Sequence, residues 1–141
     1  MSRADDAQRT FFSFRPLMAA YKVVFLPLLN KDALVSVVNS LEADFRRSGI
    51  MCKTDCGSGA IGKRYARTDE MGIPFAVTVD FDTLEDQSVT LRELVSMEQL
   101  RLPMADLKGV VLRSLEDNGI WASLQAKYPK AKVPEEEEPK A

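Results

Sequence analysis

The chain has no histidine and only two cysteines, Cys52 and Cys56. The usual zinc sites need further ligands of these types, so we expect no metal site and two free thiols. Long apolar runs are also missing, because the longest, Val23 to Leu29, is short for a membrane span and contains Pro27. The first ten residues are mostly polar and include two acids, and we therefore expect no signal peptide.

An excess of positive charge is absent too. The 141 residues include 19 basic and 21 acidic side chains, a formal charge of −2. The last seven residues, EEEEPKA, hold four of the acids and one of the bases, so the rest of the chain has a net charge of +1. This small charge argues against nonspecific coating of nucleic acid but allows a local basic patch. The length and the 45% hydrophobic content indicate one soluble globular domain.

Strand and helix patterns alternate along the chain. The strand pattern is clearest in PFAVTVDFD, where large apolar residues at 75, 77, 79 and 81 alternate with smaller or polar ones. We expect strands at 21–26, 50–53, 74–82, 89–94 and 97–102, a polar loop at 83–88, and helices at 30–49, 60–71, 103–118 and 119–129. Asn30 is the expected cap of the first helix. This order predicts an α/β fold with a mixed five-stranded sheet flanked by helices.

A glycine pattern offers one functional hypothesis. Gly57, Gly59 and Gly62 match G-x-G-x-x-G before a predicted helix, and Asp80 follows 18 residues after Gly62. This arrangement is typical of a dinucleotide-binding protein. The pattern follows the second strand rather than the first, however, and no second nucleotide-binding half is present. A glycine-rich loop that leads tightly into a helix is the alternative interpretation.

Longer segments carry a more specific signal. They are AIGKRYARTDEMGIPFAVTVDFDT from Ala60 to Thr83, TLRELVSMEQLRLP from Thr90, GIWASLQAKYP from Gly119, and DAQRTFFSF from Asp6. Together they resemble the C-terminal anticodon-binding domain of class II glycyl-tRNA synthetases of the eukaryotic and archaeal dimeric type. The resemblance covers about residues 3–129. It implies that residues 1–16 leave a catalytic domain and that 17–129 form the anticodon-binding domain, while composition predicts an acidic, disordered tail at 130–141.

The resemblance also implies a function. The domain would position tRNA-Gly and read its two anticodon cytosines, with the parent's catalytic domain as a second partner and a homodimeric parent. ATP and Mg²⁺ would serve that catalytic domain, and this chain would need no cofactor. We expect the chain alone to be non-catalytic and the parent to be cytoplasmic, with a mitochondrial copy possible. A free-standing paralogue with an accessory or protein-interaction role is the alternative, besides dinucleotide binding.

Candidate recognition residues follow from the chemistry of cytosine. Its edge presents an amino donor beside acceptors, which suits a carboxylate next to a cationic donor. The expected tRNA-binding residues are Lys63, Arg64, Arg67, Asp80, Phe81, Asp82, Thr83, Arg92 and Arg101. Phe81 could stack on a base or pack in the core, and Arg64 and Arg67 could instead pair with Asp69, Glu70 or a strand-end acid. Lys63 and Leu94-Val95 depart from the family's usual arginine and Arg-Asp pair, which removes candidate donors.

Overall fold

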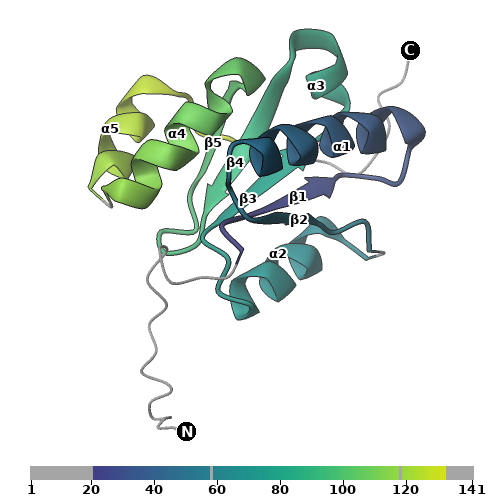
Figure 1. The fold of residues 1–141 in the computed structure, drawn as a ribbon, viewed down its shortest axis with the longest axis horizontal. Coiled ribbons are helices and arrows are strands. Elements are labelled where there is room, and N and C mark those ends of the chain that lie inside the picture. Colours follow the sequence, from purple (N-terminus) through teal and green to yellow (C-terminus); the bar gives the residue numbers. More distant parts are fainter. Residues whose placement is uncertain (1–20, 58, 118, 133–141) are drawn as a thin grey trace, which may run out of the picture.

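The computed structural model describes residues 21–57, 59–117 and 119–132 (Figure 1). Its elements, in chain order, are β1 (Val23–Pro27), α1 (Asp32–Arg47), β2 (Cys52–Thr54), α2 (Ile61–Glu70), β3 (Phe75–Val79), α3 (Phe81–Asp86), β4 (Ser88–Glu93), β5 (Gln99–Pro103), α4 (Met104–Glu116) and α5 (Ile120–Lys127). None of these helices is long and apolar enough to cross a membrane. The predicted segment at 1–16 lies outside the described residues.

The five strands form one mixed sheet in the order β2-β1-β3-β4-β5. β1 is parallel to β2 and β3, whereas β4 is antiparallel to both β3 and β5. The sheet therefore has a carboxyl-end edge, where β1, β2, β3 and β5 end, and an amino-end edge, where they begin. The chain moves from β1 to β2 and then back past β1 to β3. Right-handed crossovers consequently place α1 and α2 on opposite faces.

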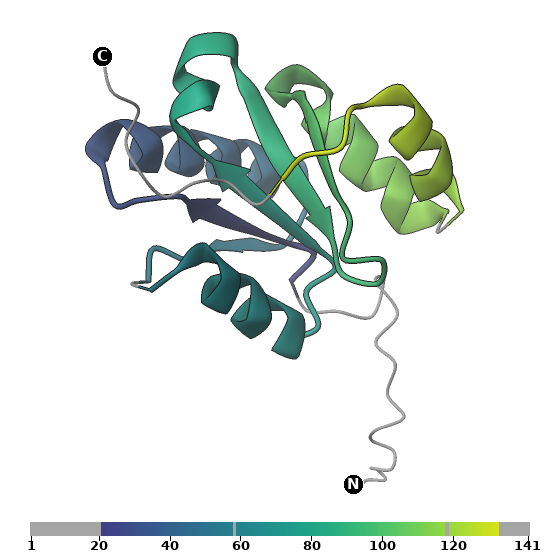
Figure 2. The same ribbon diagram turned by 180° about the vertical axis from the view of Figure 1, so that it is seen from behind.

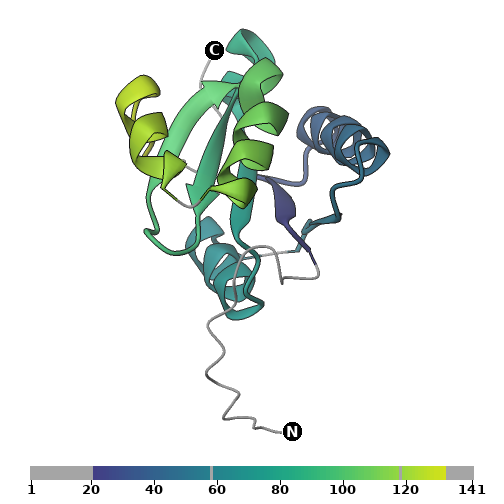
Figure 3. The ribbon, with the colours of Figure 1, turned by 60° about the vertical axis from the view of Figure 1, so that its left-hand side comes forward.

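One face of the sheet is covered by α1, α4 and α5 (Figures 1 and 3). Phe25 of β1 meets Phe45 of α1 edge-on, with ring centroids 5.1 Å apart, and the centroid of Phe75 lies 6.3 Å from that of Trp121 in α5. The predicted core is confirmed, with Leu41 half-buried and the others buried: Val23, Phe25, Leu34, Val38, Ile61, Phe75, Val77, Val79 and Val111.

On the opposite face α2 covers β1 and β3, and no helix lies over β4 and β5 in the described chain (Figure 2). Strand alternation places polar side chains on this side of β4 and β5. We call Ser88, Thr90, Arg92, Gln99 and Arg101 the open face; Thr78 of β3 borders it under α2. After α5 the chain runs beside β5, where the Arg101 N–H donates to the Pro129 carbonyl over 2.9 Å and the Ala131 N–H to that of Gln99 over 2.9 Å. This pairing extends just past the predicted domain boundary at residue 129.

The segment after β3 differs from its prediction. A polar loop was expected at 83–88 and a strand at 74–82, but β3 ends at Val79 and α3 begins at Phe81. Asp80 caps this helix: its carboxylate accepts from the Thr83 N–H, while the Thr83 hydroxyl accepts from the Asp80 N–H. This capping box stabilises a helix start. Phe81 therefore leaves the strand alternation, although its half-buried ring still packs against the core.

The start of α1 and the two cysteines are further local features that the sequence predicted. Lys31, not Asn30, occupies the N-cap of α1, and the Asn30 amide instead donates to the Cys56 carbonyl over 2.8 Å. Asn30 thus ties the loop after β1 to the loop after β2. Cys52 and Cys56 are free thiols as expected, the first buried and the second exposed.

Candidate nucleic-acid interface

Arg64 holds the ends of β1 and β2 together at the carboxyl-end edge. Its guanidinium donates to the carbonyls of Pro27 at 2.8 Å, Leu28 at 3.3 Å and Asp55 at 2.7 Å. The residue is only 2% exposed, and its Nε is buried without a partner. Ile61, Arg64, Tyr65 and Thr68 form the buried stripe of α2, which explains why this arginine points inward. The described geometry makes Arg64 a residue that positions two loops.

Arg67, one turn further along α2, reaches the acid that follows β2. Its Nη2 lies 3.1 Å from the Asp55 carboxylate, which also accepts from the Gly57 N–H over 2.8 Å. Partial burial opposes ionisation of Asp55, but the hydrogen bonds from Gly57 and Arg67 outweigh it and hold the pKa below its usual value. A Cβ on Gly57 would lie 2.8 Å from the Asp55 carboxylate, so the glycine permits this close approach. Arg67 remains 45% exposed and can still face a ligand.

Asp80 and Arg101 form a bidentate ion pair beside the start of α3. The Arg101 Nη1 and Nη2 lie 2.8 and 2.9 Å from the two carboxylate oxygens of Asp80. Arg101 also donates to the side chains of Ser88 and Thr90. Because Asp80 additionally accepts from Thr83, its carboxylate is largely occupied within the protein. The pair connects β3, β4 and β5 across the open face.

A second pair lies further along the open face. Arg92 donates to Asp69 of α2 over 2.6 Å, and its guanidinium carbon lies 4.9 Å from the centroid of the Tyr65 ring. The Tyr65 hydroxyl is 2.6 Å from that of Thr78, and burial is the main cause that raises the Tyr65 pKa. This cation–aromatic stack joins α2 to β4.

Comparison with known proteins assigns a family to this chain. A family model described as the anticodon binding domain matches residues 22–114. The chain belongs to this family. A glycine–tRNA ligase of Bombyx mori is 47% identical over 129 residues, which are 91% of this chain and 18% of that protein. The ligase of Methanothermobacter thermautotrophicus is 46% identical over 106 residues, 75% of this chain and 19% of that protein.

The chain spans about a fifth of the length of these curated relatives. The resemblance to glycyl-tRNA synthetases noted in the sequence is confirmed. A solved structure of prolyl-tRNA synthetase from Cryptosporidium parvum, with L-proline and AMP, has a TM-score of 0.69 at 19% identity. The match covers 81% of this chain and 25% of the prolyl-tRNA synthetase chain, and it supports the assignment of the fold. The expected mixed five-stranded α/β architecture is therefore confirmed for this anticodon-binding domain.

All predicted site residues of the domain except Arg92 fall into two connected groups. Lys63, Arg64 and Arg67 lie on α2, and Asp80 to Thr83 with Arg101 surround the start of α3. The two groups meet where the Leu28 N–H donates to the Val79 carbonyl over 2.9 Å, next to the carbonyls that Arg64 binds. Lys63 and Asp82 are exposed, and Phe81 is half-buried. These three side chains and Arg67 are the predicted residues that present accessible groups at the carboxyl-end edge.

The other predicted positions are more distant. Arg92 pairs with Ala76 across the strands and faces the middle of the open face. Leu94 and Val95 begin the β4–β5 turn at the amino-end edge, so the departure at these positions lies away from the carboxyl-end edge. The glycine pattern follows β2, which is an edge strand of the sheet. The Asp80 carboxylate forms an ion pair with Arg101. Neither the geometry nor the comparisons favour the dinucleotide alternative.

Four residues of this surface were not predicted from the sequence. Asp55, Ser88, Thr90 and Gln99 hold or flank the predicted arginines. A period-two pattern was available, because polar residues at 88, 90 and 92, and again at 99 and 101, alternate with apolar ones. Within the described ranges no three His, Cys, Asp or Glu side chains gather as a metal site would require.

Proposed function

We propose that this domain binds the anticodon loop of tRNA-Gly and reads its two cytosines as part of a glycine–tRNA ligase. The observation that carries the proposal is the anticodon-binding family match over residues 22–114, in a chain whose relatives are glycine–tRNA ligases. Every predicted site residue, from Lys63 to Arg101, lies within this match.

The rest of the ligase belongs to the same proposal. The parent's catalytic domain would use ATP and Mg²⁺ to activate glycine and would work as a homodimer in the cytoplasm. One relative, from Saccharomyces cerevisiae, is named as a mitochondrial glycine–tRNA ligase and is 47% identical over 100 residues, which supports a mitochondrial copy. This chain would supply tRNA selection and need no cofactor.

Accessible side chains would make the contacts. Asp82, exposed in the first turn of α3, would accept from the cytosine amino group, and the half-buried ring of Phe81 would stack on a base. Lys63 and Arg67 would hold backbone phosphates. The engaged side chains would shape the surface: Arg64 positions the loops, Asp80 and Thr83 cap α3, and Arg101 and Arg92 order the open face.

Binding of anticodon stem-loops tests this proposal. A stem-loop with both cytosines should bind more tightly than one in which either is changed to uracil, by about 1–3 kcal/mol per position, because uracil places an acceptor against a carboxylate. Asp82→Ala should reduce this difference. Arg67→Ala should weaken every stem-loop and flatten the salt dependence, because a phosphate contact carries no sequence information.

Glu85→Ala is the matched control, since Glu85 is an exposed acid on the same helix α3. It should leave the ratio between the stem-loops unchanged. The ratio should be measured at one low salt concentration. Equal binding of CC and UU loops, together with unchanged binding after Phe81→Ala, would contradict the proposal and favour an accessory role.

A further inference from the structure

The loop after β1, residues 28–31, lies in the middle of the carboxyl-end edge, because β1 is between β2 and β3 in the sheet. On one side the Leu28 N–H donates to the Val79 carbonyl at the end of β3 over 2.9 Å. On the other side the Asn30 amide donates to the Cys56 carbonyl, in the loop after β2, over 2.8 Å. The loop therefore joins the two groups of residues that are proposed to contact tRNA.

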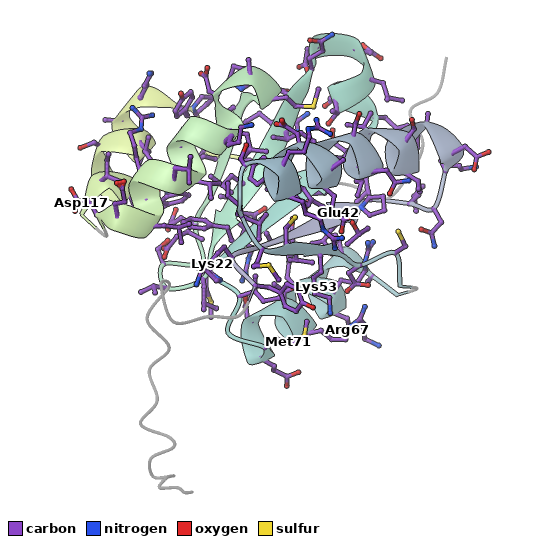
Figure 4. All side chains as sticks on the ribbon, viewed as in Figure 1. Lys22, Glu42, Lys53, Arg67, Met71 and Asp117 are labelled. Atoms are coloured by element: carbon purple, nitrogen blue, oxygen red, sulfur yellow. The ribbon has the colours of Figure 1, made fainter. Side chains whose placement is uncertain are left out.

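Asn30 is exposed and has accessible residues of the proposed site on both sides. Arg67 lies 3.1 Å from the carboxylate of Asp55, the residue before Cys56. Figure 4 shows Arg67 on the same side of the molecule as the loop between β2 and α2. In the other direction α1, which starts just after Asn30, is in contact with α3, which starts at Phe81. Asn30 thus lies between a cationic group and an aromatic one.

The contact with Cys56 fixes which way the Asn30 amide faces. An asparagine side chain has a carbonyl oxygen that accepts and an NH₂ group with two donors, and a solvated one can turn over. The Cys56 carbonyl can only accept, so the amide nitrogen of Asn30 must face it. The Oδ1 and the second N–H then form the outer side of the amide, and neither has a hydrogen-bond partner among the residues that the structure describes.

The order of these two groups matches cytosine and not uracil. The Watson–Crick edge of cytosine presents the N4 amino donor beside the N3 acceptor, whereas uracil presents the O4 acceptor beside an N3–H donor. The Asn30 Oδ1 would accept from the N4 amino group of cytosine, and the second N–H would donate to N3. Against uracil the same groups would set acceptor against acceptor and donor against donor. Turning the amide over would restore that fit only by losing the contact with Cys56.

We propose that Asn30, held by the Cys56 carbonyl, reads one of the two anticodon cytosines, and that the exposed carboxylate of Asp82 reads the other. This assignment rests on the proposed function and deepens it, because each cytosine is given its own protein group, one on the loop after β1 and one on α3. The sequence predicted Asn30 only as a helix cap. Its partner is a backbone carbonyl of another loop, which the types of the residues do not reveal.

Binding of anticodon stem-loops to the full 141-residue chain tests this assignment, with cytosine or uracil placed separately at each of the two positions. Asn30→Ala should lower the preference for cytosine on the order of ten-fold at one position and leave the other position unchanged. Asp82→Ala should lower the preference at the other position. Since Asn30→Ala and the change to uracil remove the same contact, their effects on affinity should not add at the position that Asn30 reads.

Two further variants separate reading of a base from a purely structural role. Asn30→Asp keeps the shape of the side chain but replaces the NH₂ group by an oxygen, so it should lose the preference at the same position as Asn30→Ala. Asn39→Ala, which alters an exposed asparagine further along α1, is the matched control and should leave the preference at both positions unchanged. If Asn30 only tied the two loops together, its removal would weaken every stem-loop by the same factor.

Three results would overturn the assignment. In Asn30→Ala, an unchanged preference at both positions, or an equal fall at both, would show that Asn30 does not read a single cytosine. A fall at the same position in Asn30→Ala and Asp82→Ala would overturn the division between these two residues. In each case the tRNA proposal stands if the unaltered chain prefers the CC loop. Equal binding of CC and UU loops by the unaltered chain would instead overturn the tRNA proposal, and this assignment with it.

Discussion

Lys63 and Arg64 are neighbours on α2 with the same charge, yet they lie in opposite environments. Lys63 is exposed, whereas Arg64 is 2% exposed and donates to three backbone carbonyls. The sequence contains a signal for this difference, because Ile61, Arg64, Tyr65 and Thr68 follow the spacing of one helix face. Positive charge alone suggested that both residues contact RNA. The helical period instead predicts that Arg64 faces the sheet.

Arg64→Ala should lower the free energy of unfolding by about 3 kcal/mol or more, because three carbonyls lose their donor and each buried, unpaired group costs about 1–3 kcal/mol. Chemical denaturation of the full chain measures this change. Lys63→Ala is the control, and its effect should stay within about 0.5 kcal/mol because the side chain is exposed. Equal stability of the two variants would contradict the role assigned to Arg64.

At the scale of elements, α3 was the segment that sequence patterns missed. The apolar alternation of β3 continues through Phe81 and so imitates a longer strand. The competing signal is short: Asp80 and Thr83 have the spacing of a capping box, and only six residues of helix follow Asp80. Local capping ended the strand two residues earlier than the apolar pattern indicated. The longer elements were predicted to within a few residues because their periodicity extends over more turns.

The end of α3 gives a prediction of its own. Gln87 caps this helix with φ +59°, a left-handed conformation that is unfavourable for a side chain with a Cβ. Gln87→Gly should raise the free energy of unfolding by up to about 1 kcal/mol, because the relief of strain exceeds the added flexibility of the unfolded chain. Thermal unfolding measures the effect. Glu85→Gly, inside the same helix, should instead destabilise by about 1 kcal/mol; a change of the same sign in both variants would refute this account.

For the whole molecule, the sequence predicted the sheet but not the ion pairs across it. Alternating βα units imply parallel strands and a mixed sheet, and the structure confirms both. The pairing of Asp80 with Arg101 depends on register, since Thr78 lies opposite Thr90 and Thr90 opposite Arg101. A shift of one residue would turn Arg101 to the other face. Sequence alone could place charged residues near strand ends but could not assign their partners.

Those ion pairs also bear on whether the chain has enzymatic activity of its own. Glycine activation would require cationic groups that stabilise the charge developing on the phosphates of ATP. At the described surface Arg101 is bound to Asp80, Arg92 to Asp69, and Arg64 to backbone carbonyls. The geometry commits these arginines to holding the fold, and the accessible cations Lys63 and Arg67 are the ones proposed to hold RNA phosphates. We therefore expect no glycine-dependent ATP–pyrophosphate exchange from the purified chain.

The exchange assay should include a full-length glycine–tRNA ligase as a positive control, at equal molar concentration and with the same glycine and ATP. The chain should give the rate of the enzyme-free reaction, with and without glycine. Exchange that depends on glycine and follows the chain through successive chromatographic steps would show that it activates the amino acid itself. The site for that reaction would then lie outside the arginine pairs described here, because each of them would have to break to reach a nucleotide.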